Sequence, residues 1–518
     1  MLQTASRQVG FFDTSELIGP LPDGSFYALL AEHGERIISD ADFADCYSAT
    51  RGRPSIPPSQ LAKLMLLQYR SGLSDEQAME AVQWDLRWKA ALDLPVDHAG
   101  WDPSSLTRFR ARLMLHGKER LVLENSLKLA EEVGLLDAPA EQIVDSTPML
   151  GAAATQDTVR LVRSGVRKLL DAVKEVDEGA GTILDDGLEF DYEQPSQKPD
   201  CRWRAKAERE RMLTRVAQDA ERALQAVERA EGLRDHEAVT GARDLLRELI
   251  GQDFDVDEAG IPHLHRGTRA GRILSVHDPE MRHGRKSAQH RFDGFKLHAA
   301  ATNGATPLLT AIEVTPASEQ DGLQAKNLVD QQPEERRPQR ILGDTAYGTG
   351  PVREELDERQ VEVLAPVPAA PAGDDRLLKR DFRIDLERGT VTCPAEQVAR
   401  ITSAPSGRRW ATFSKPVCDG CPLRARCLGP VKGRRQIRIA PQEGLLIAAR
   451  QALDDPNTAE HLRRTRPRIE RLLSLLARRY GARKSRYRGR RKAVLQAAWA
   501  AALVNLNPIG ARLAAQAA

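Results

Sequence analysis

The spacing of hydrophobic residues predicts helices at the two ends of the chain and strands in its middle. Residues 1–135 read mostly as helices, because Leu61, Leu64 and Leu67 recur at helical spacing before a Ser-Gly break. Ser74 is followed three residues later by a glutamine, the pattern of a capping box that begins another helix. Short helices with arginine-rich faces fit a helix-turn-helix DNA-binding module, and they fit a plain helical bundle about as well.

From residue 139 to 369 strand patterns alternate with helical ones. A first short strand, Ile143 and Val144, ends at Asp145, and a polar helical tract of about 157–252 then predicts an antiparallel helical pair. Strands resume with FDGFKLHAAAT and TPLLTAIEVTP, which predict a hairpin across an Asn-Gly-Ala turn. A helix, the strand RILGD, another helix and the strand VEVLAPV follow. This order indicates an α/β fold with a ribonuclease-H-like mixed sheet.

After residue 369 the chain has few helical signals until residue 442. Segment 370–440 is loop-rich and contains most of the cysteines, and helices return at 442–506, ending in the Ala-rich run VLQAAWAAALVNL, which predicts a buried helix. We therefore expect an N-terminal helical domain with a candidate DNA-binding role, a core in two parts, a helical insertion, a Cys-rich insertion, and C-terminal helices that complete the core. Their expected bounds are 1–135, 136–155 with 263–369, 156–262, 370–440 and 441–518.

Charge is distributed very unevenly along the 518 residues. The net charge is +2, but residues 401–518 hold 25 Lys and Arg against 6 Asp and Glu, which leaves −17 for residues 1–400. This asymmetry suggests that the C-terminal part meets a polyanion, although solvated helix faces are the alternative. No stretch approaches the ~18 consecutive apolar residues of a membrane span, and the N-terminus lacks a secretory pattern. Six cysteines are too few for a disulfide scaffold, so we expect the reducing cytoplasm.

Three separated carboxylates occupy distinctive positions. Glu470 is the one acid among fourteen Lys and Arg between Arg463 and Lys492, while Asp145 and Asp344 each end an apolar, strand-like run. Two-metal cutting of a phosphodiester needs hard oxygen ligands around ions about 4 Å apart. Each acid also has a structural reading as a turn residue or a helix salt-bridge partner. Their joint placement favours a metal site.

The cysteines form a second cluster. Cys393, Cys418, Cys421 and Cys427 are spaced C-x24-C-x2-C-x5-C. Four thiolates with a CxxC knuckle can close a tetrahedral Zn²⁺ site, and a small loop-rich segment needs such a staple. Reduced cysteines without a metal are the alternative.

Cations with interleaved tyrosines follow the third acid in RRYGARKSRYRGRRK. Arginine forks bind phosphates and aromatic rings stack on unpaired bases, so this run predicts a surface that binds the nucleic-acid backbone. The candidate DNA-binding residues are Arg466, Arg478, Arg483, Lys484, Arg486, Arg488, Arg490 and Lys492. The histidines around the hairpin have no metal-binding spacing, which favours solvated or phosphate-facing side chains; they are His277, His283, His290 and His298.

Several stretches resemble the DDE transposases of bacterial insertion sequences, of the kind with a helical N-terminal domain and a Cys-rich insert. VDSTPM and LGDTAYG surround the first two acids, with HDPEMRHG, FDGFKLHAA and VTPASEQDG between them. RPRIERLLSLLARRYGARKSRYRG surrounds the third acid, and KAVLQAAWAAALVNL follows it. RGRPSIPPSQLAKLMLLQY resembles the helical domain that precedes the core in these proteins. The core stretches run in order from about residue 140 to 507.

The resemblance implies that Asp145, Asp344 and Glu470 are catalytic acids that hold Mg²⁺ (or Mn²⁺). It also implies that Arg466 belongs to the Tyr-Arg-Glu-Lys signature of the family, although Arg463 and an alanine occupy the Tyr and Lys positions. The expected function is binding of the inverted-repeat ends of an insertion sequence, metal-dependent cleavage and strand transfer to target DNA. The alternatives are a structure-specific DNA nuclease and an inactive transposase-derived DNA-binding protein. We expect double-stranded DNA as partner, a homodimer on DNA, no membrane contact, and a cytoplasmic, nucleoid-associated location.

Overall fold

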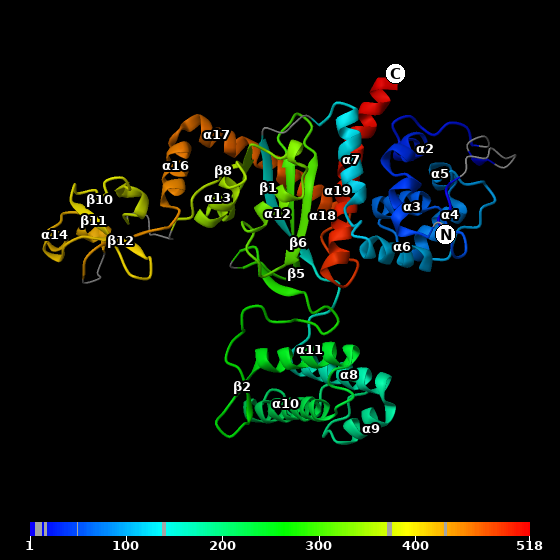
Figure 1. The fold of residues 1–518 in the computed structure, drawn as a ribbon, viewed down its shortest axis with the longest axis horizontal. Helices are drawn as coiled ribbons and strands as arrows, with labels where there is room; N and C mark the ends of the chain where they lie inside the picture. The colour runs from blue at the N-terminus through cyan, green and yellow to red at the C-terminus, as the bar shows by residue number, and fades with distance from the viewer. Residues whose placement is uncertain are drawn as a thin grey trace.

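A computed structural model of the chain describes residues 1–5, 13–14, 18–48, 50–136, 141–287, 289–369, 376–428 and 433–517. A mixed β-sheet lies at the centre, with the N-terminal helices on one side and a smaller β-sheet at the opposite end of the molecule (Figure 1). A separate group of helices lies below the central sheet in this view (Figure 1). The prediction of a mixed α/β fold is confirmed.

The N-terminal part is helical, as predicted. Its capping box is present, because Gln77 N donates to Ser74 Oγ at 3.1 Å and Ser74 N donates to Gln77 Oε1 at 2.9 Å. The described elements are α2 (Phe26–Ile37), the 3-10 helix η1 (Asp40–Cys46), α3 (Pro58–Ser71), α4 (Asp75–Trp84), α5 (Leu86–Ala91), α6 (Ser104–Leu115) and α7 (Leu121–Glu132).

The central sheet has the strand order β6-β5-β1-β7-β8, and β4 also pairs with the first residues of β5. The hairpin of β5 and β6 is antiparallel, as predicted, whereas β7 and β8 run parallel to β1. Helices α12 (Gln324–Asp330) and α13 (Gly350–Asp357) form the crossovers. The strand bounds are β1 (Glu141–Leu150), β4 (Arg282–Arg285), β5 (Arg291–Thr302), β6 (Leu309–Pro316), β7 (Arg340–Leu342) and β8 (Glu362–Leu364).

The two faces of the sheet pack against different hydrophobic clusters. Ile143 and Met149 of β1 belong to the large cluster formed with the N-terminal and C-terminal helices, whereas Val144 belongs to the cluster under α12 and α13. Successive side chains of a strand point to opposite faces, so this alternation defines the side of the sheet on which each polar residue of β1 lies.

The prediction that the first strand ends at Asp145 is wrong. β1 continues to Leu150 because its pairing with β5 runs without a break from Gln142 opposite Thr302 to Leu150 opposite Gly294. Asp145 therefore lies in the middle of a strand whose backbone is fixed on the β5 side.

The prediction of a helical pair after β1 is also wrong, because this region contains four helices and a two-stranded sheet. Asp177 ends the first helix and caps the second, its Oδ1 accepting from Ala180 N at 2.9 Å. The segment packs around its own core of valine and leucine side chains. Its elements are α8 (Thr158–Val176), α9 (Glu178–Asp186), α10 (Lys206–Arg229), α11 (Glu237–Asp253), β2 (Phe254–Val256) and β3 (Pro262–Leu264).

The cysteine-containing segment is a five-stranded antiparallel sheet rather than a set of loops, with the order β13-β12-β11-β10-β9. One face is apolar because alternate residues such as Val391, Ala411 and Ile437 pack with Phe382 and Phe413. We call residues 376–440 the cysteine module. Its elements are the 3-10 helix η4 (Lys379–Asp381), β9 (Arg383–Asp385), β10 (Thr390–Thr392), β11 (Val398–Ser403), β12 (Arg409–Thr412), α14 (Lys415–Asp419), α15 (Arg424–Cys427) and β13 (Gln436–Ile439).

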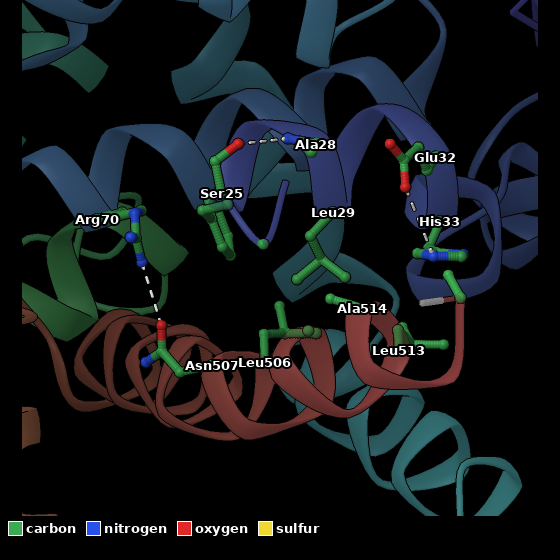
Figure 2. Close-up of a pocket in the computed structure, with 14 residues that line it drawn as sticks. Ser25, Ala28, Leu29, Glu32, His33, Arg70, Leu506, Asn507, Leu513 and Ala514 are labelled. Atoms are coloured by element: carbon green, nitrogen blue, oxygen red, sulfur yellow. Dashed lines mark hydrogen bonds and ion pairs between the residues drawn. The ribbon is translucent and has the colours of Figure 1, made fainter. Parts of the chain in front are cut away.

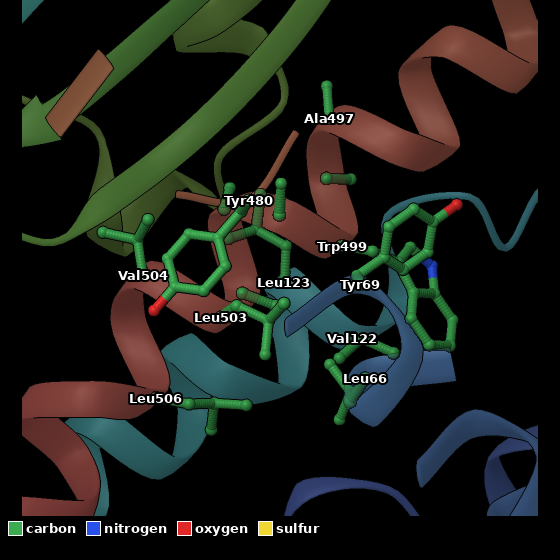
Figure 3. Packing of buried hydrophobic residues seen from close by; sticks show 14 of the residues in the cluster. Leu66, Tyr69, Val122, Leu123, Tyr480, Ala497, Trp499, Leu503, Val504 and Leu506 are labelled. Atoms are coloured by element: carbon green, nitrogen blue, oxygen red, sulfur yellow. The ribbon is translucent and has the colours of Figure 1, made fainter. Parts of the chain in front are cut away.

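The chain ends in α16 (Glu443–Asp454), α17 (Pro456–Thr465), α18 (Pro467–Arg478) and α19 (Arg490–Ala517). The Ala-rich helix α19 is buried, as predicted, and its Trp499 ring lies 6.3 Å from that of Tyr69 (Figure 3). Among the described helices α19 alone is long and apolar enough to span a membrane, but 83% of its most apolar window is buried, as in the core helix of a folded domain. A pocket between α2 and α19 is lined in part by Arg70 and Asn507 and contains none of the three candidate acids (Figure 2).

Candidate active site

Asp145 and Asp344 occupy equivalent positions on neighbouring parallel strands. The pairing of β1 with β7 ends at Ile143 opposite Leu342, and each aspartate stands two residues further along its own segment. The backbones of β1 and β7 are therefore no longer paired where the two carboxylates lie. Asp344 begins the 3-10 helix η3 (Thr345–Gly348), and its Oδ1 accepts from Ala346 N at 2.8 Å. This short cap fixes the side chain at the end of the ladder.

Glu470 reaches the same region from a helix. It lies in the first turn of α18, which packs against β1 and β5. The opposite side of α18 is buried in the large cluster through Ile469, Leu472, Leu473 and Leu476. The Glu470 side chain is 59% exposed, and its Oε1 lies 4.0 Å from Arg466 Nη2, one helical turn away. The arginine that the resemblance connected with the third acid is therefore beside it.

Strand register and the packing of α18 bring the three acids to one region, and their charges influence the pKa of Asp145. Burial raises the pKa of Asp145 to about 6, a backbone hydrogen bond from Ser146 N opposes that rise, and the negative charges of Asp344 and Glu470 add to it. Arg466 acts in the opposite direction and lowers this pKa. Like charges perturb one another in this way only when they are close and poorly screened. Carboxylates separated by 199 and 126 residues in the sequence thus form one acid cluster.

Tyr347 adds a buried hydroxyl to the acid cluster. Its side chain is enclosed, and burial raises its pKa well above the ordinary value, with further contributions from Asp145, Asp321 and Asp344. The hydroxyl has no hydrogen-bond partner among the described residues. A neutral donor without a partner near Asp145 and Asp344 is unusual in a folded interior, where most buried polar groups are satisfied. The arrangement fits a site that is completed by a further polar ligand.

A hydrogen-bond network supports β1 from the opposite face of the sheet. Asp321 accepts from Ser146 Oγ at 2.7 Å and from Lys296 Nζ at 2.6 Å, and Lys296 also donates to Glu319 O at 2.7 Å. Because Ser146 directly follows Asp145, this network holds the backbone that carries the first acid. The sequence interpretation missed Lys296 and Asp321, although both lie in stretches that carry the family resemblance.

The interpretation of the hairpin histidines is wrong for His298. This side chain is completely buried, and its Nε2 lies 2.9 Å from Thr315 Oγ1. Burial lowers its pKa to about 4, so the ring is neutral. His298 is opposite Ser146 in the β1–β5 ladder and is therefore part of the support beneath the acids, not of a solvated surface.

The basic run lies directly beside the end of β1. Leu150 N donates to Arg483 O at 2.9 Å, and Ser485 N donates to Leu150 O at 2.7 Å. This pairing places Arg483 and Lys484 five residues along the strand from Asp145. Several candidate DNA-binding cations are exposed and make no side-chain hydrogen bond or ion pair with the described parts of the chain. These are Arg478, Arg483, Lys484, Arg488 and Lys492.

Two other cations of the run have structural partners. Arg486 donates to the carbonyl of Leu73, and its guanidinium lies over the Tyr69 ring at 5.4 Å. Arg490 lies 3.6 Å from Glu280 and 3.7 Å from Glu313. These contacts attach the run to the N-terminal helices and to the central sheet, so its cations do not form a single free face.

The four clustered cysteines line one small pocket of about 30 Å³. Burial raises the pKa of Cys427, nearby Arg435 lowers it, and the other three thiols raise it, which shows that all four approach one another. Tetrahedral zinc would hold its sulfurs about 3.8 Å apart. No three of these sulfurs all lie within 4.8 Å of one another, so they are more widely spaced than around a bound ion. Among the described residues, donor atoms this close together are found in Asp45, Cys46 and His116.

Asp45, Cys46 and His116 form a poor metal site, because the ammonium group of Lys118 lies 2.9 Å from Asp45 Oδ1 and neutralises the carboxylate. Among the described residues the oxygens of Asp145, Asp344 and Glu470 also do not all lie within 4.8 Å of one another, but their chemistry suits metal ions. Hard carboxylate oxygens are the ligands that Mg²⁺ and Mn²⁺ prefer, and ligands shared between two ions can be further apart than those around one.

Two family models match the chain. Residues 16–112 match a transposase domain (DUF772), and residues 251–506 match a transposase DDE domain. Together the two matches cover well over half of the chain, which belongs to the DDE transposases of the insertion-sequence type. Enzymes of this family act on DNA and generally use divalent metal ions. Comparisons with curated proteins and with solved structures give no match.

The DDE match includes Asp344 and Glu470 but begins after Asp145. The place of Asp145 in the acid cluster therefore rests on strand register and electrostatics. The helices α8 to α10 separate it from the matched region.

Proposed function

We propose that this protein is a transposase that cleaves the ends of an insertion sequence and joins them to target DNA, with Asp145, Asp344 and Glu470 as catalytic acids. The observation that carries the proposal is geometric: Asp145 and Asp344 lie at the open end of the β1–β7 ladder, and Glu470 lies on the helix that packs against β1. The charges of Asp344 and Glu470 also raise the pKa of Asp145. A cluster of mutually repelling acids, one of them with a raised pKa, indicates a functional site, and in a protein of this family a metal site fits it best.

The roles of the residues follow from their positions. The three acids would hold divalent ions, Mg²⁺ or Mn²⁺, which activate the attacking oxygen and stabilise the leaving oxygen when bound. Arg466 offsets the negative charge at Glu470 and can contact a phosphate of the bound strand. Tyr347 supplies a neutral hydroxyl that can donate to a carboxylate of the cluster. Lys296 and Asp321 hold the strand that carries Asp145.

The chain organisation also belongs to this proposal. The central sheet with α18 and α19 would be a ribonuclease-H-like catalytic core, and the α8–β3 segment and the cysteine module would be insertions in it. The N-terminal helices would add DNA contacts. We propose a dimer on DNA, since two inverted-repeat ends must be held together, and a cytoplasmic, nucleoid-associated location.

A strand-transfer assay tests the function. Purified full-length protein is incubated with Mg²⁺, a labelled duplex that carries the DNA flanking its gene, and a supercoiled target plasmid. The proposal requires joined product that depends on both the metal and the flanking sequence. Cleaved ends without joined product would instead support a structure-specific nuclease, and binding without cleavage would support an inactive DNA-binding protein.

The exposed cations beside β1 should bind phosphates. Replacing Arg483, Lys484 and Arg488 together by alanine should weaken binding of every duplex and reduce the slope of log K against log salt by about 0.9 for each phosphate that is no longer neutralised. Titration by fluorescence anisotropy at several salt concentrations measures both effects. The matched control replaces Arg204, Arg211 and Arg229, exposed on or near α10, and should keep the wild-type slope. An unchanged slope in the first variant would contradict the assignment.

We also propose that the four cysteines bind a structural zinc ion. Metal analysis of protein purified without chelators should find about one zinc per chain, as in closed four-cysteine sites. Replacing Cys418 and Cys421 by serine should remove the metal and lower the melting temperature, because binding energy of such a site is folding energy. Cys201, which lies in the helical segment, is the control and its serine variant should keep the zinc. Wild-type protein without zinc would refute the site.

A further inference from the structure

The cysteine module is the second most basic part of the molecule after the run at 463–492. Residues 376–440 hold 15 Lys and Arg against 5 Asp and Glu. The helical segment 158–264, which is also built onto the central sheet, holds 17 against 24. Two added segments of one chain thus have opposite charge. Of these two segments, the cysteine module is the one whose net positive charge suits contact with a polyanion.

The register of the module sheet determines where its cations lie. The apolar residues Ala399, Ile401 and Ala411 fill the inner face, so the residues between them along each strand face outward. On that outer face Thr402 is opposite Trp410, and Trp410 is opposite Arg438 on β13. The three positions form a row across neighbouring strands in which an aromatic ring lies beside an arginine.

A second outward arginine lies on the neighbouring strand pair. Arg400 of β11 is opposite Thr390 of β10, and Thr390 is opposite Asp385 of β9. Arg400 and Arg438 are exposed and make no side-chain hydrogen bond or ion pair with the described parts of the chain, while Trp410 is half-buried. The outer face therefore combines free guanidinium groups, small threonines and an accessible indole with one acid, Asp385, which pairs with Arg388.

The cationic surface continues around the edge of the sheet. β13 is an edge strand, and a hollow of about 400 Å³ follows it, lined by Lys379, residues 435–438, Ala440 and Pro441. Three cations line this hollow, of which Lys379 is paired with Glu443 and the two arginines carry the free charge. Arg435 donates to the carbonyls of Cys427 and Leu377, so its guanidinium is held in place by the module itself. Arg435, which is held in place, and Arg438, which is free, could bind successive phosphates of one strand.

We propose that the outer face of the module sheet, with Arg400, Trp410 and Arg438 at its centre, is a second DNA-binding surface. The inference rests on the proposed function, which supplies DNA as the partner. The guanidinium groups would contact phosphates, and Trp410 would stack on an unpaired or distorted base. Charge complementarity favours DNA over a protein partner, since an indole beside exposed arginines suits a phosphate backbone and its bases.

The surface lies far from the N-terminal helices, at the other end of the molecule, with the central sheet between them (Figure 1). DNA held at both places would therefore extend past the central sheet, which carries the acid cluster. Contacts made by the cysteine module would serve binding of DNA away from the cut phosphate, not the chemistry of cutting. This separation distinguishes the module from the cations beside β1.

The test measures binding of full-length protein to a fluorescein-labelled 40-bp duplex of mixed sequence and to oligo(dT), over a range of salt. We expect the double variant Arg400→Ala and Arg438→Ala to reduce the slope of log K against log salt on the duplex by about 1.8, because two phosphates are no longer neutralised. Trp410→Ala should weaken oligo(dT) binding about 5- to 160-fold, and Trp410→Phe should restore most of it. The control double variant is Arg211→Ala and Arg229→Ala on α10, which removes the same charge from an exposed face.

The outcomes separate this inference from the proposed function. If the module variants bind as the α10 control does, while wild-type protein still binds, cuts and joins DNA, the second surface is refuted and the function stands. If wild-type protein binds neither probe, the proposed function itself fails. Hydroxyl-radical footprinting adds a spatial readout, because loss of the surface should expose DNA only at a distance from the cleaved phosphate. Protection unchanged along the whole duplex would overturn the inference.

Discussion

Replacing Asp344 by asparagine should reduce DNA cleavage by about 10³-fold or more, as removal of an essential catalytic group does, while DNA binding is kept. The asparagine side-chain oxygen can still accept from Ala346 N, so the cap of η3 and the local fold are retained. The variant lacks only the negative charge that a divalent ion requires. Cleavage of a labelled duplex under single-turnover conditions, with binding measured in parallel, checks both parts.

The matched control for this variant is Glu460→Gln. Glu460 is a surface acid of α17 that pairs with Arg463, close in sequence to the third acid but with no contribution to the pKa of Asp145. It should cleave at the wild-type rate. Equal loss of binding and cleavage in Asp344→Asn would show a folding defect, and near-normal cleavage would remove Asp344 from the active site.

The second large effect concerns stability without metal. The folded pKa of Asp145, about 6, lies above its ordinary value of 3.8, so its contribution to folding is present at acidic pH and is lost as the pH rises through about 6. At pH 8 the ionised carboxylate should therefore destabilise the metal-free protein, by on the order of 3 kcal/mol at most. Asp145→Asn should melt at a higher temperature than wild type in EDTA at pH 8.

Two further measurements test whether the stability change comes from the charge of Asp145. The difference between the proteins should shrink as the pH is lowered from 8 toward 4, because the wild-type carboxyl then becomes neutral. Added Mg²⁺ should raise the melting temperature of wild type but not of Asp145→Asn, since ligand binding stabilises only the protein that binds. A variant that melts below wild type in EDTA at pH 8 would contradict the account of the acid cluster.

The three acids could be predicted from the sequence because each one stands in a distinctive local pattern. Asp145 and Asp344 follow hydrophobic strand residues, and Glu470 stands alone among cations. What the pattern could not provide is the register. That Ile143 is opposite Leu342, which sets the two aspartates side by side, is a contact between segments almost 200 residues apart. No local signal encodes it.

The misjudged features depend on tertiary partners in the same way. Arg486 and Arg490 look like the other cations of the basic run, and only their contacts with Leu73, Glu280 and Glu313 distinguish them. Lys296 and Asp321 look like surface residues until β5 and the loop after β6 bring them to Ser146.

The sheet of the cysteine module was missed for a different reason. Its strands are three to six residues long, and their alternation includes small residues such as Ala399 and Ala411. So short a pattern with alanine on the buried face is close to that of a loop. The module cations were consequently grouped with those of the C-terminal helices, although they lie on a separate sheet.

The central claim, that three acids form one metal-binding site, is tested most directly by locating the metal. Crystals of the protein grown or soaked with Mn²⁺ should give an anomalous difference peak bounded by Asp145, Asp344 and Glu470, within about 2.5 Å of carboxylate oxygens. The same experiment on Asp344→Asn should lose or weaken the peak. Full Mn²⁺ occupancy elsewhere in the protein, with no peak among these three carboxylates, would contradict the account.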